Sequence, residues 1–292
     1  MTMNDKISDY ITFPRTFENY RWYKPILVFI VGFIIMLVLG AAITEIFYIM
    51  LGADFIIPVL DGGYEILNSP LAIFFTDLLV IIFIPSLYLA SKVVRDRPFS
   101  SYSSSRGGWN FKLYFKALVI PVILYIIYMG AVTAIKGPEG TFSLSLAFVL
   151  VILISVPLQS IAEEYVFRGF FMQTFGSWFK IPVLGIALQA IIFAMCHGYN
   201  SIGLFETLVS GIVCGFFAWK TDGIEVSSAL HTANNFSAGL FIMLGLETST
   251  SSPQFGDVAL TIVFIIILAV IMYYVGRKTE WFGEIPQNSQ DI

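Results

Sequence analysis

Long apolar runs separated by short polar connections are the dominant pattern along this 292-residue chain. A helix needs about 20 apolar residues to cross the hydrocarbon core of a bilayer. Eight runs approach or exceed that length, so the pattern predicts about eight transmembrane helices. The predicted spans cover residues 25–51, 70–92, 113–135, 142–171, 181–197, 202–220, 226–246 and 258–275.

The composition agrees with this pattern. Hydrophobic residues make up 57% of the chain and charged residues 12%, against about 25% charged residues in an ordinary soluble domain. These figures exclude a soluble globular protein and a disordered chain, and a net charge of −4 gives no basic surface for nucleic acid. The predicted fold class is an all-α polytopic membrane protein. Two cysteines, Cys196 and Cys214, both lie in apolar runs, and we expect both to be small core residues.

Basic residues near the helix ends predict the orientation, because Lys and Arg favour the cytoplasmic side. With eight spans, all but one of the sixteen Lys and Arg residues lie on one side, and Lys136 is the exception. Both chain ends are therefore predicted to be cytoplasmic.

The same pattern predicts the organisation of the chain. Residues 1–24 form a cytoplasmic segment, and residues 25–112 form a helix pair with a polar loop. Residues 113–278 form the helical core, and residues 279–292 form a cytoplasmic tail.

Ionisable residues inside a span are costly and usually face a cavity or a partner. Glu163, Glu164 and Arg168 lie near the end of the fourth run. Glu164 and Arg168 are four residues apart and can form an ion pair on one helix face. Glu163 is turned about 100° away from Glu164 and is left to face a wet cavity. Read alone, the three residues also fit a charge cluster at a helix end.

The chain has two histidines, and both lie in apolar segments. His231 and Asn235 are four residues apart, so they project from one helix face. Phe193 precedes His197 by four residues and can pack on its ring. Each pair alone fits a packing or helix-joining role.

Together these residues make a set of parts for hydrolysis. A carboxylate next to a histidine can take a proton from water, and a histidine and an amide can donate to an oxyanion. Glu163, His197, His231 and Asn235 are therefore the candidate catalytic residues. In a simple helix ladder Glu163 and His197 are too far apart along the membrane normal. They can meet only if the fourth helix runs on beyond the membrane core or the stretch 176–182 dips inward.

Three motifs carry a resemblance to a known family. They are EExxxR at Glu163, Glu164 and Arg168, FxxxH at Phe193 and His197, and HxxxN at His231 and Asn235. In this order and on successive spans, over about 143–246, they resemble the CPBP family. This family includes the type II CAAX prenyl endopeptidases and the Abi proteins of bacteriocin self-immunity.

The resemblance implies an intramembrane glutamic endopeptidase. Glu163 and His197 would activate water, His231 and Asn235 would form an oxyanion hole, and Glu164, Arg168 and Phe193 would support them. The family is described as metal-independent. The residues alone leave zinc open, because two histidines and a glutamate can bind it, and we favour no metal because an asparagine serves best as a donor. The spacing HExxH of membrane metalloproteases is not found at His197.

The expected substrate is a membrane-embedded or lipid-associated peptide or protein, cut near the cytoplasmic side of the plasma membrane. A non-catalytic scaffold or bacteriocin self-immunity protein on the same fold is the first alternative. A proton-coupled transporter that uses the same residues as a relay is the second, and the lack of an internal repeat weighs against it.

Overall fold

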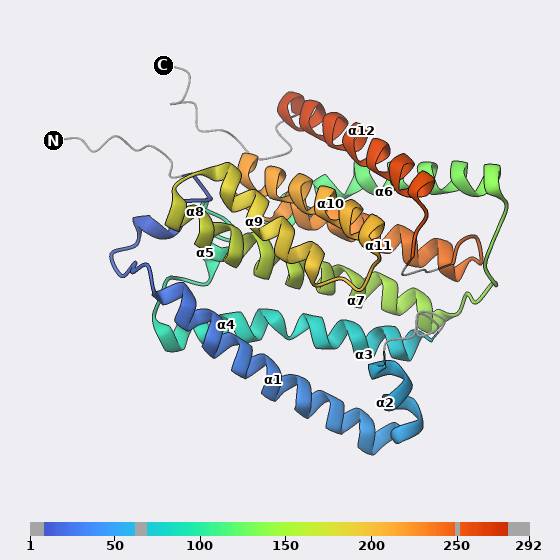
Figure 1. Cartoon of the computed structure of the whole chain (residues 1–292), viewed down its shortest axis with the longest axis horizontal. Helices are drawn as coiled ribbons and strands as arrows, with labels where there is room; N and C mark the ends of the chain where they lie inside the picture. Colours follow the sequence, from blue (N-terminus) through green and yellow to red (C-terminus); the bar gives the residue numbers. More distant parts are fainter. Residues whose placement is uncertain (1–8, 62–68, 249–251, 280–292) are drawn as a thin grey trace.

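The computed structural model describes residues 9–61, 69–248 and 252–279 (Figure 1). Residues 1–8 of the predicted N-terminal segment lie outside these ranges. So do residues 280–292 of the predicted tail 279–292. Within them the chain is helical apart from turns and one isolated bridge between Ser104 and Gly223. The elements are η1 (Phe13–Thr16), α1 (Lys24–Leu51), α2 (Ala53–Leu60), α3 (Pro70–Ile81), α4 (Phe83–Val94), α5 (Ser100–Ser103), α6 (Phe111–Lys136), α7 (Leu146–Glu164), η3 (Tyr165–Met172), α8 (Gln173–Phe179), α9 (Pro182–Met195), α10 (Ser201–Lys220), α11 (Glu225–Met243) and α12 (Phe255–Thr279).

The all-α polytopic membrane fold is confirmed. Among the described residues, six helices are long and apolar enough to cross a membrane. These are Lys24–Leu51, Pro70–Val94, Phe111–Lys136, Leu146–Phe179, Ser201–Lys220 and Phe255–Lys278. The other two expected spans correspond to α9 and α11. The 14 residues of α9 are about 21 Å long at helical rise, which is short for a span. Helix α11 carries too many polar residues to be recognised by hydropathy.

Local signals in the sequence explain where several helices begin. The side chains of Ser69, Asn110, Ser145 and Asn200 accept hydrogen bonds from backbone N–H groups in the first turns of α3, α6, α7 and α10, as N-cap residues do. Proline occupies the first turn of α1, α3 and α9, where its missing N–H costs no helical hydrogen bond.

The fourth predicted span is longer than expected. Helix α7 continues through η3 and α8 as one apolar helical run of 34 residues, Leu146–Phe179, or about 51 Å at helical rise. The hydrocarbon core is about 30 Å thick, so this helix is longer than the core. Of the two arrangements expected from the sequence, a longer fourth helix or an inward dip of residues 176–182, the structure has the longer helix. At Lys180 the backbone adopts a left-handed conformation with φ 59°, and α9 then returns along the same helix.

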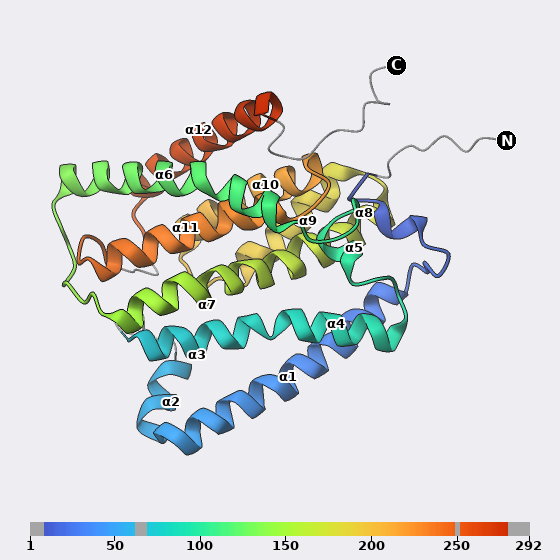
Figure 2. The ribbon, with the colours of Figure 1, turned by 180° about the vertical axis from the view of Figure 1, so that it is seen from behind.

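Helix α11 lies in the middle of the bundle and packs against α6, α7 and α10 (Figures 1 and 2). Ser227 and Ser228 on it are fully buried, and the Tyr114 hydroxyl donates to Thr232 Oγ1 at 3.0 Å. Because its neighbours shield it from lipid, α11 can carry polar residues that a lipid-facing helix could not.

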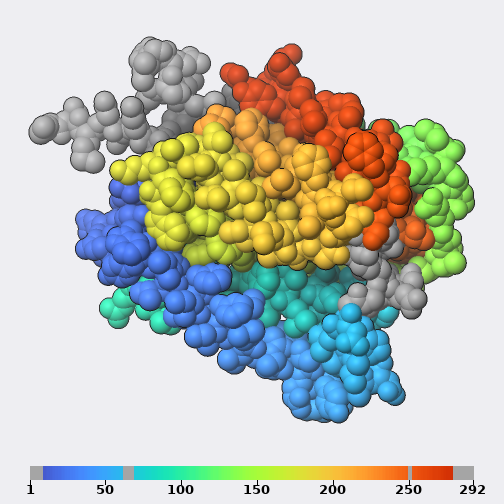
Figure 3. All heavy atoms as spheres, viewed as in Figure 1, coloured from blue at the N-terminus to red at the C-terminus, as the bar shows by residue number. Residues whose placement is uncertain are grey.

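Helices α1 and α12 lie at opposite edges of the bundle (Figures 1 and 2). Their outward faces expose large apolar side chains such as Leu37, Val38, Val263 and Ile266. In the space-filling view, α1 and α2 project from the body while α9 and α10 cover its front (Figure 3). Such large exposed apolar faces are rare on soluble proteins, and we expect lipid tails to cover them.

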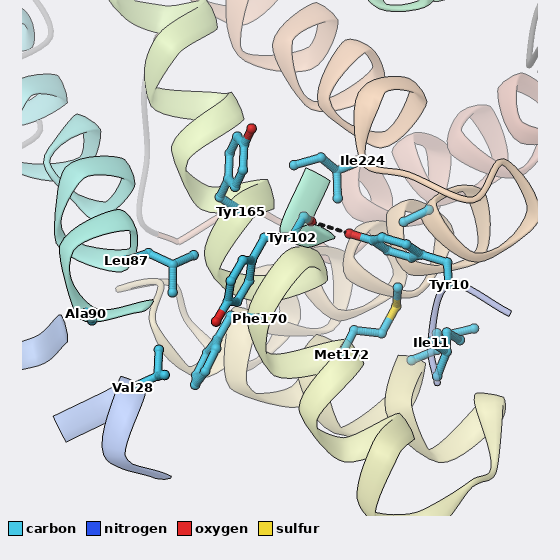
Figure 4. Packing of buried hydrophobic residues seen from close by; sticks show 12 residues of the cluster. Tyr10, Ile11, Val28, Leu87, Ala90, Tyr102, Tyr165, Phe170, Met172 and Ile224 are labelled. Carbon is cyan, nitrogen blue, oxygen red and sulfur yellow. Dashed lines mark hydrogen bonds between the residues drawn. The ribbon is translucent and has the colours of Figure 1, made fainter. Parts of the chain in front are cut away.

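The segment before α1 packs against the helical body. Tyr10 and Ile11 are completely buried in a cluster with Tyr102, Phe170 and Met172 (Figure 4). The Tyr10 hydroxyl donates to the backbone oxygen of Tyr102. The described part of the predicted N-terminal segment is thus a packed element of the fold.

The beginning of α1 and the end of α12 lie at the same end of the bundle (Figures 1 and 2), as an even number of crossings requires. That this end faces the cytoplasm stays a prediction from the charge pattern.

Candidate active site

Two antiparallel helices, α7 and α11, bring polar side chains together as two facing pairs. Glu163 lies opposite His231, and one turn away Gln159 lies opposite Asn235. Gln159 and Glu163 are four residues apart on α7, as are His231 and Asn235 on α11, so the two residues of each helix share a face. These two pairs place three of the four candidate catalytic residues, Glu163, His231 and Asn235, side by side.

The two carboxylate oxygens of Glu163 have different surroundings. Oε1 accepts a hydrogen bond from Gln159 Nε2 at 2.7 Å. Oε2 lies 3.5 Å from His231 Nε2, and the Glu163 side chain is 13% exposed. Among the described residues Oε2 is buried and has no hydrogen-bond partner. A buried carboxylate oxygen without a donor is costly, and such an exception calls for a functional explanation.

Glu164, the next residue after Glu163, belongs to a buried group of charged side chains. Glu164 Oε1 accepts from Arg168 Nη1 at 2.7 Å, and both side chains are 0% exposed. The predicted ion pair is therefore present. The same Oε1 lies 3.0 Å from His231 Nδ1. Arg168 Nη2 donates to the Gly211 carbonyl at 3.2 Å, and its guanidinium lies 4.4 Å from the centre of the Phe193 ring.

His231 is held between two carboxylates, because its Nδ1 faces Glu164 and its Nε2 faces Glu163. Glu164 is already paired with Arg168 and accepts from Nδ1–H. A doubly protonated imidazole ring would donate to both glutamates. The two carboxylates would then balance one guanidinium and one imidazolium.

Asn235 is oriented by three polar neighbours. Its Nδ2 donates to Gln159 Oε1 at 3.1 Å and to Ser160 Oγ at 3.4 Å. Its Oδ1 accepts from Asn234 Nδ2 at 3.0 Å. The amide N–H side of Asn235 therefore faces α7.

His197 lies just beyond the end of α9, in the turn before α10. Its Nδ1 lies 2.8 Å from the Phe193 carbonyl, and since a carbonyl can only accept, this bond places a proton on Nδ1. The neutral ring then has Nε2 free to accept a proton. The His197 backbone N–H bonds to the Ala194 carbonyl, so the Phe193 carbonyl lacks its usual partner four residues on and can accept from the His197 ring.

Phe193 connects the two histidines. Its ring centre lies 4.7 Å from that of His197 and 5.7 Å from that of His231. Glu163 interacts electrostatically with Cys196, the residue before His197. His197 thus belongs to the same region, joined to the others through Phe193 and Arg168.

Close packing of α10 against α9 supports this arrangement. A Cβ atom on Gly211 would lie 3.1 Å from Ala190 Cβ and 3.3 Å from a ring carbon of Phe193. One on Gly215 would lie 2.8 Å from Gln189 Nε2. The glycines allow the approach that lets the Gly211 carbonyl reach Arg168.

One sequence expectation is wrong, and one residue of the site was not predicted. Cys196 is exposed while Cys214 is buried, so the prediction that both are core residues is wrong for Cys196, which lies past the last helical turn of α9. Gln159 had no role assigned, although its position four residues before Glu163 was a usable signal. Asp77 on α3 accepts from Ser155 Oγ at 2.6 Å and has a structural partner.

The residues gathered here suit proton transfer and stabilisation of an oxyanion. They offer a buried carboxylate, two imidazoles and an amide. Within the described ranges no group of three or more His, Cys, Asp or Glu side chains is arranged to hold a metal ion.

The comparisons with known proteins agree with the motifs. Residues 144–237 match the family model of type II CAAX prenyl endopeptidase Rce1-like proteins, and this region contains all the candidate residues. The chain is also 26% identical over 246 residues to the uncharacterized protein YyaK of Bacillus subtilis (strain 168), an alignment that covers 75% of this chain and 81% of that protein. No solved structure matches. The resemblance is confirmed over about a third of the chain, and it indicates a CAAX-protease-type fold in a multi-pass membrane protein.

Proposed function

We propose that this protein is an intramembrane glutamic endopeptidase that hydrolyses a peptide bond in a membrane-associated peptide or protein. The observation that carries the proposal is Glu163 Oε2, a buried carboxylate oxygen with no hydrogen-bond partner among the described residues, 3.5 Å from His231 Nε2. In this proposal a water molecule that these two atoms bind is the nucleophile. The match to the Rce1-like family at 144–237 supports the same reading.

In this proposal Glu163 removes a proton from water, and the water oxygen attacks the carbonyl carbon of the substrate. His197 Nε2 accepts from the same water, because Nδ1 holds its proton against the Phe193 carbonyl. The carbonyl oxygen becomes an oxyanion, which His231 Nε2–H stabilises together with the Asn235 N–H that otherwise makes the long contact of 3.4 Å with Ser160 Oγ. The proton on Glu163 then passes to the leaving amine nitrogen as the C–N bond breaks.

Glu164 and Arg168 have a supporting role in this scheme. The Glu164 carboxylate accepts from His231 Nδ1 at 3.0 Å, which fixes the ring and keeps Nε2 directed at the reacting atoms. Arg168 neutralises Glu164, and both of these side chains are closed to solvent. Breaking either contact would release the ring of His231.

The apolar helices that carry the site favour a substrate that enters from the membrane. Peptide N–H and C=O groups need partners inside the hydrocarbon region, and Asn234 and Asn235 lie in part exposed near Glu163. We expect a membrane-embedded or lipid-associated substrate, with the protein in the plasma membrane.

The test compares the N-terminal peptides of membranes from cells that carry the wild type or Glu163→Gln at matched levels. Glu206→Gln is the matched control, because it also neutralises a partly buried glutamate in a span but lies on α10 away from the site. New termini with the wild type and the control but not with Glu163→Gln support the proposal. The same termini with all three proteins would refute it.

Two further experiments separate the alternatives. If Glu163→Ala still restores the phenotype of a deletion strain, the protein acts as a scaffold or as a bacteriocin self-immunity protein. Substrate-driven proton flux in proteoliposomes that is lost with Glu163→Gln, without cleavage, would instead identify a transporter.

A further inference from the structure

We propose that Gln159 is a positioning residue of this site, which holds Glu163 and Asn235 in their reactive orientations through a single amide group. This inference rests on the proposed function. Gln159 Nε2 donates to Glu163 Oε1 at 2.7 Å, and Gln159 Oε1 accepts from Asn235 Nδ2 at 3.1 Å. The carboxylate on α7 and the amide on α11 are thereby joined by one side chain.

The direction of the hydrogen bonds follows from chemistry. An ionised carboxylate only accepts, so the NH2 group of Gln159 must face Glu163. Its carbonyl must then face Asn235, and Asn235 must present its own NH2 group toward α7. The Asn235 carbonyl turns to the other side, where Asn234 Nδ2 donates to it at 3.0 Å.

The amides therefore form a chain in which every donor points toward Glu163. Asn234 donates to Asn235, Asn235 donates to Gln159, and Gln159 donates to the carboxylate. Successive bonds in such a chain polarise one another. If Asn235 were flipped, its carbonyl would face the place of the oxyanion and would repel it.

A purely structural role would be a hydrogen bond that joins two helices. Gln159 differs in that one of its two bonds ends on Glu163, whose other oxygen is left for water. The adjacent Ser160 is fully buried, whereas Gln159 is partly exposed. It lies on the open side of the site with Glu163.

Other charged groups also act on Glu163, and a test must keep them unchanged. From α11 it faces His231, from α3 it interacts electrostatically with Asp77, and from the end of α9 with Cys196. The ion pair of Glu164 and Arg168 lies behind it. In the described part of the chain none of these groups forms a hydrogen bond with the Gln159 amide, whose partners are Glu163, Ser160 and Asn235. Replacing Gln159 therefore leaves them in place.

The experiment measures cleavage by purified protein in proteoliposomes, with the substrate found by terminal mapping, for Gln159→Leu, Gln159→Glu and the control Tyr128→Phe. The control removes one interhelical hydrogen bond, Tyr128 to Thr261 at 2.9 Å, remote from the site. We expect Gln159→Leu to lower kcat about 10- to 100-fold with KM changed less than about threefold, because substrate contacts stay. The control should stay within about twofold of the wild type.

The pH dependence distinguishes positioning from packing. A carboxylate that has lost a donor to its charged form holds its proton more tightly. The acid side of the pH–rate profile of Gln159→Leu should therefore move to higher pH by about one unit. Gln159→Glu should regain activity as the pH falls, since the introduced carboxyl can donate to Glu163 only when protonated.

An infrared titration makes the test independent of activity. The carboxyl band that Glu163→Gln removes is followed with pH in the wild type and in Gln159→Leu, and its midpoint should move upward by about one unit. An unchanged midpoint, or a kcat of folded Gln159→Leu equal to that of Tyr128→Phe, would overturn the inference. If Glu163→Gln cleaves like the wild type, the proposed function fails, and the infrared midpoint still decides whether Gln159 holds Glu163.

Discussion

The buried ion pair of Glu164 and Arg168 should contribute far more to stability than the exposed pair of Lys136 and Asp257. Arg168 and Glu164 are 0% exposed and 2.7 Å apart, whereas Lys136 and Asp257 are 39% and 48% exposed. Replacing Arg168 by Met keeps much of the side-chain volume but leaves Glu164 without its guanidinium partner. His231 Nδ1 would remain as a donor to its Oε1.

The magnitude follows from burial. Removing one partner of a buried ion pair costs about 3–5 kcal/mol, because the remaining charge is uncompensated. Arg168→Met also removes the donor to the Gly211 carbonyl and the contact with the Phe193 ring, worth about 1 kcal/mol each. Lys136→Met should cost about 0–1 kcal/mol, as exposed pairs do.

Unfolding in mild detergent micelles, followed by circular dichroism with increasing SDS, measures the difference between the two variants. We expect Arg168→Met to lose at least about 3 kcal/mol more than Lys136→Met. Arg168→Lys should fall between them, because an ammonium group keeps the charge but lacks the fork that reaches both Glu164 and Gly211. Equal losses for the two Met variants would show that Arg168 does not compensate a buried charge.

Three further predictions follow from other contacts. Burial raises the pKa of Glu225, at the start of α11, to about 7, so stability should fall from about pH 4.5 to pH 7 as the unfolded chain releases a proton that the folded chain keeps. Glu225→Gln, which can still accept from the Asn110 N–H, should lose this dependence and gain about 3 kcal/mol at pH 8, measured by unfolding at several pH values. Gly211→Val should cost about 1–3 kcal/mol through overpacking, measured as a lower Tm. Alkylation of exposed Cys196 by a bulky maleimide should block cleavage, and Cys196→Ser should abolish the block because Cys214 is buried.

Each of these has an outcome that would contradict it. A pH dependence unchanged in Glu225→Gln would mean that another group causes it. A Gly211→Val protein as stable as the wild type would mean that α9 and α10 can separate without loss. Full activity after complete labelling of Cys196 would place that residue away from the substrate path.

Spacing rules predicted the parts of the site that lie on one helix. The contact between Glu164 and Arg168 and the common face of His231 and Asn235 follow from the helical repeat. The role of Gly211 and Gly215 in close packing follows from small residues at helical spacing. Such features are local, and the sequence contains them in full.

Features that depend on the meeting of distant segments could not be read from the sequence. Gln159 gains its meaning from Asn235, more than 70 positions away. Tyr10 looked like part of a polar segment, yet a niche formed by Tyr102 and Met172 buries it completely. The exposure of Cys196 depends on where α9 ends, and an apolar run predicts helix boundaries poorly.

The geometry of the α8–α9 turn explains how the site can form in a membrane. Lys180, the residue of left-handed conformation at the turn, lies midway in the sequence between Glu163 and His197. The segments 163–180 and 180–197 have the same length and run in opposite directions from this turn. Their far ends therefore lie at the same level, about 25 Å from the turn. The fourth helix therefore has to extend beyond the hydrocarbon core before it can return with His197 at the level of Glu163.

Besides α9, one further element supports this extra length. The segment before α1 provides the support: Ile11 packs against Gly176, Arg15 Nη1 donates to the Ser177 carbonyl at 2.9 Å, and Trp178 Nε1 donates to the Trp22 carbonyl at 2.8 Å. These contacts hold α8 where the turn begins. A shift of α8 by one residue would move His197 by about 1.5 Å and rotate it by about 100° relative to Glu163. The N-terminal segment, which contributes no side chain to the site, thus fixes the register on which the site depends.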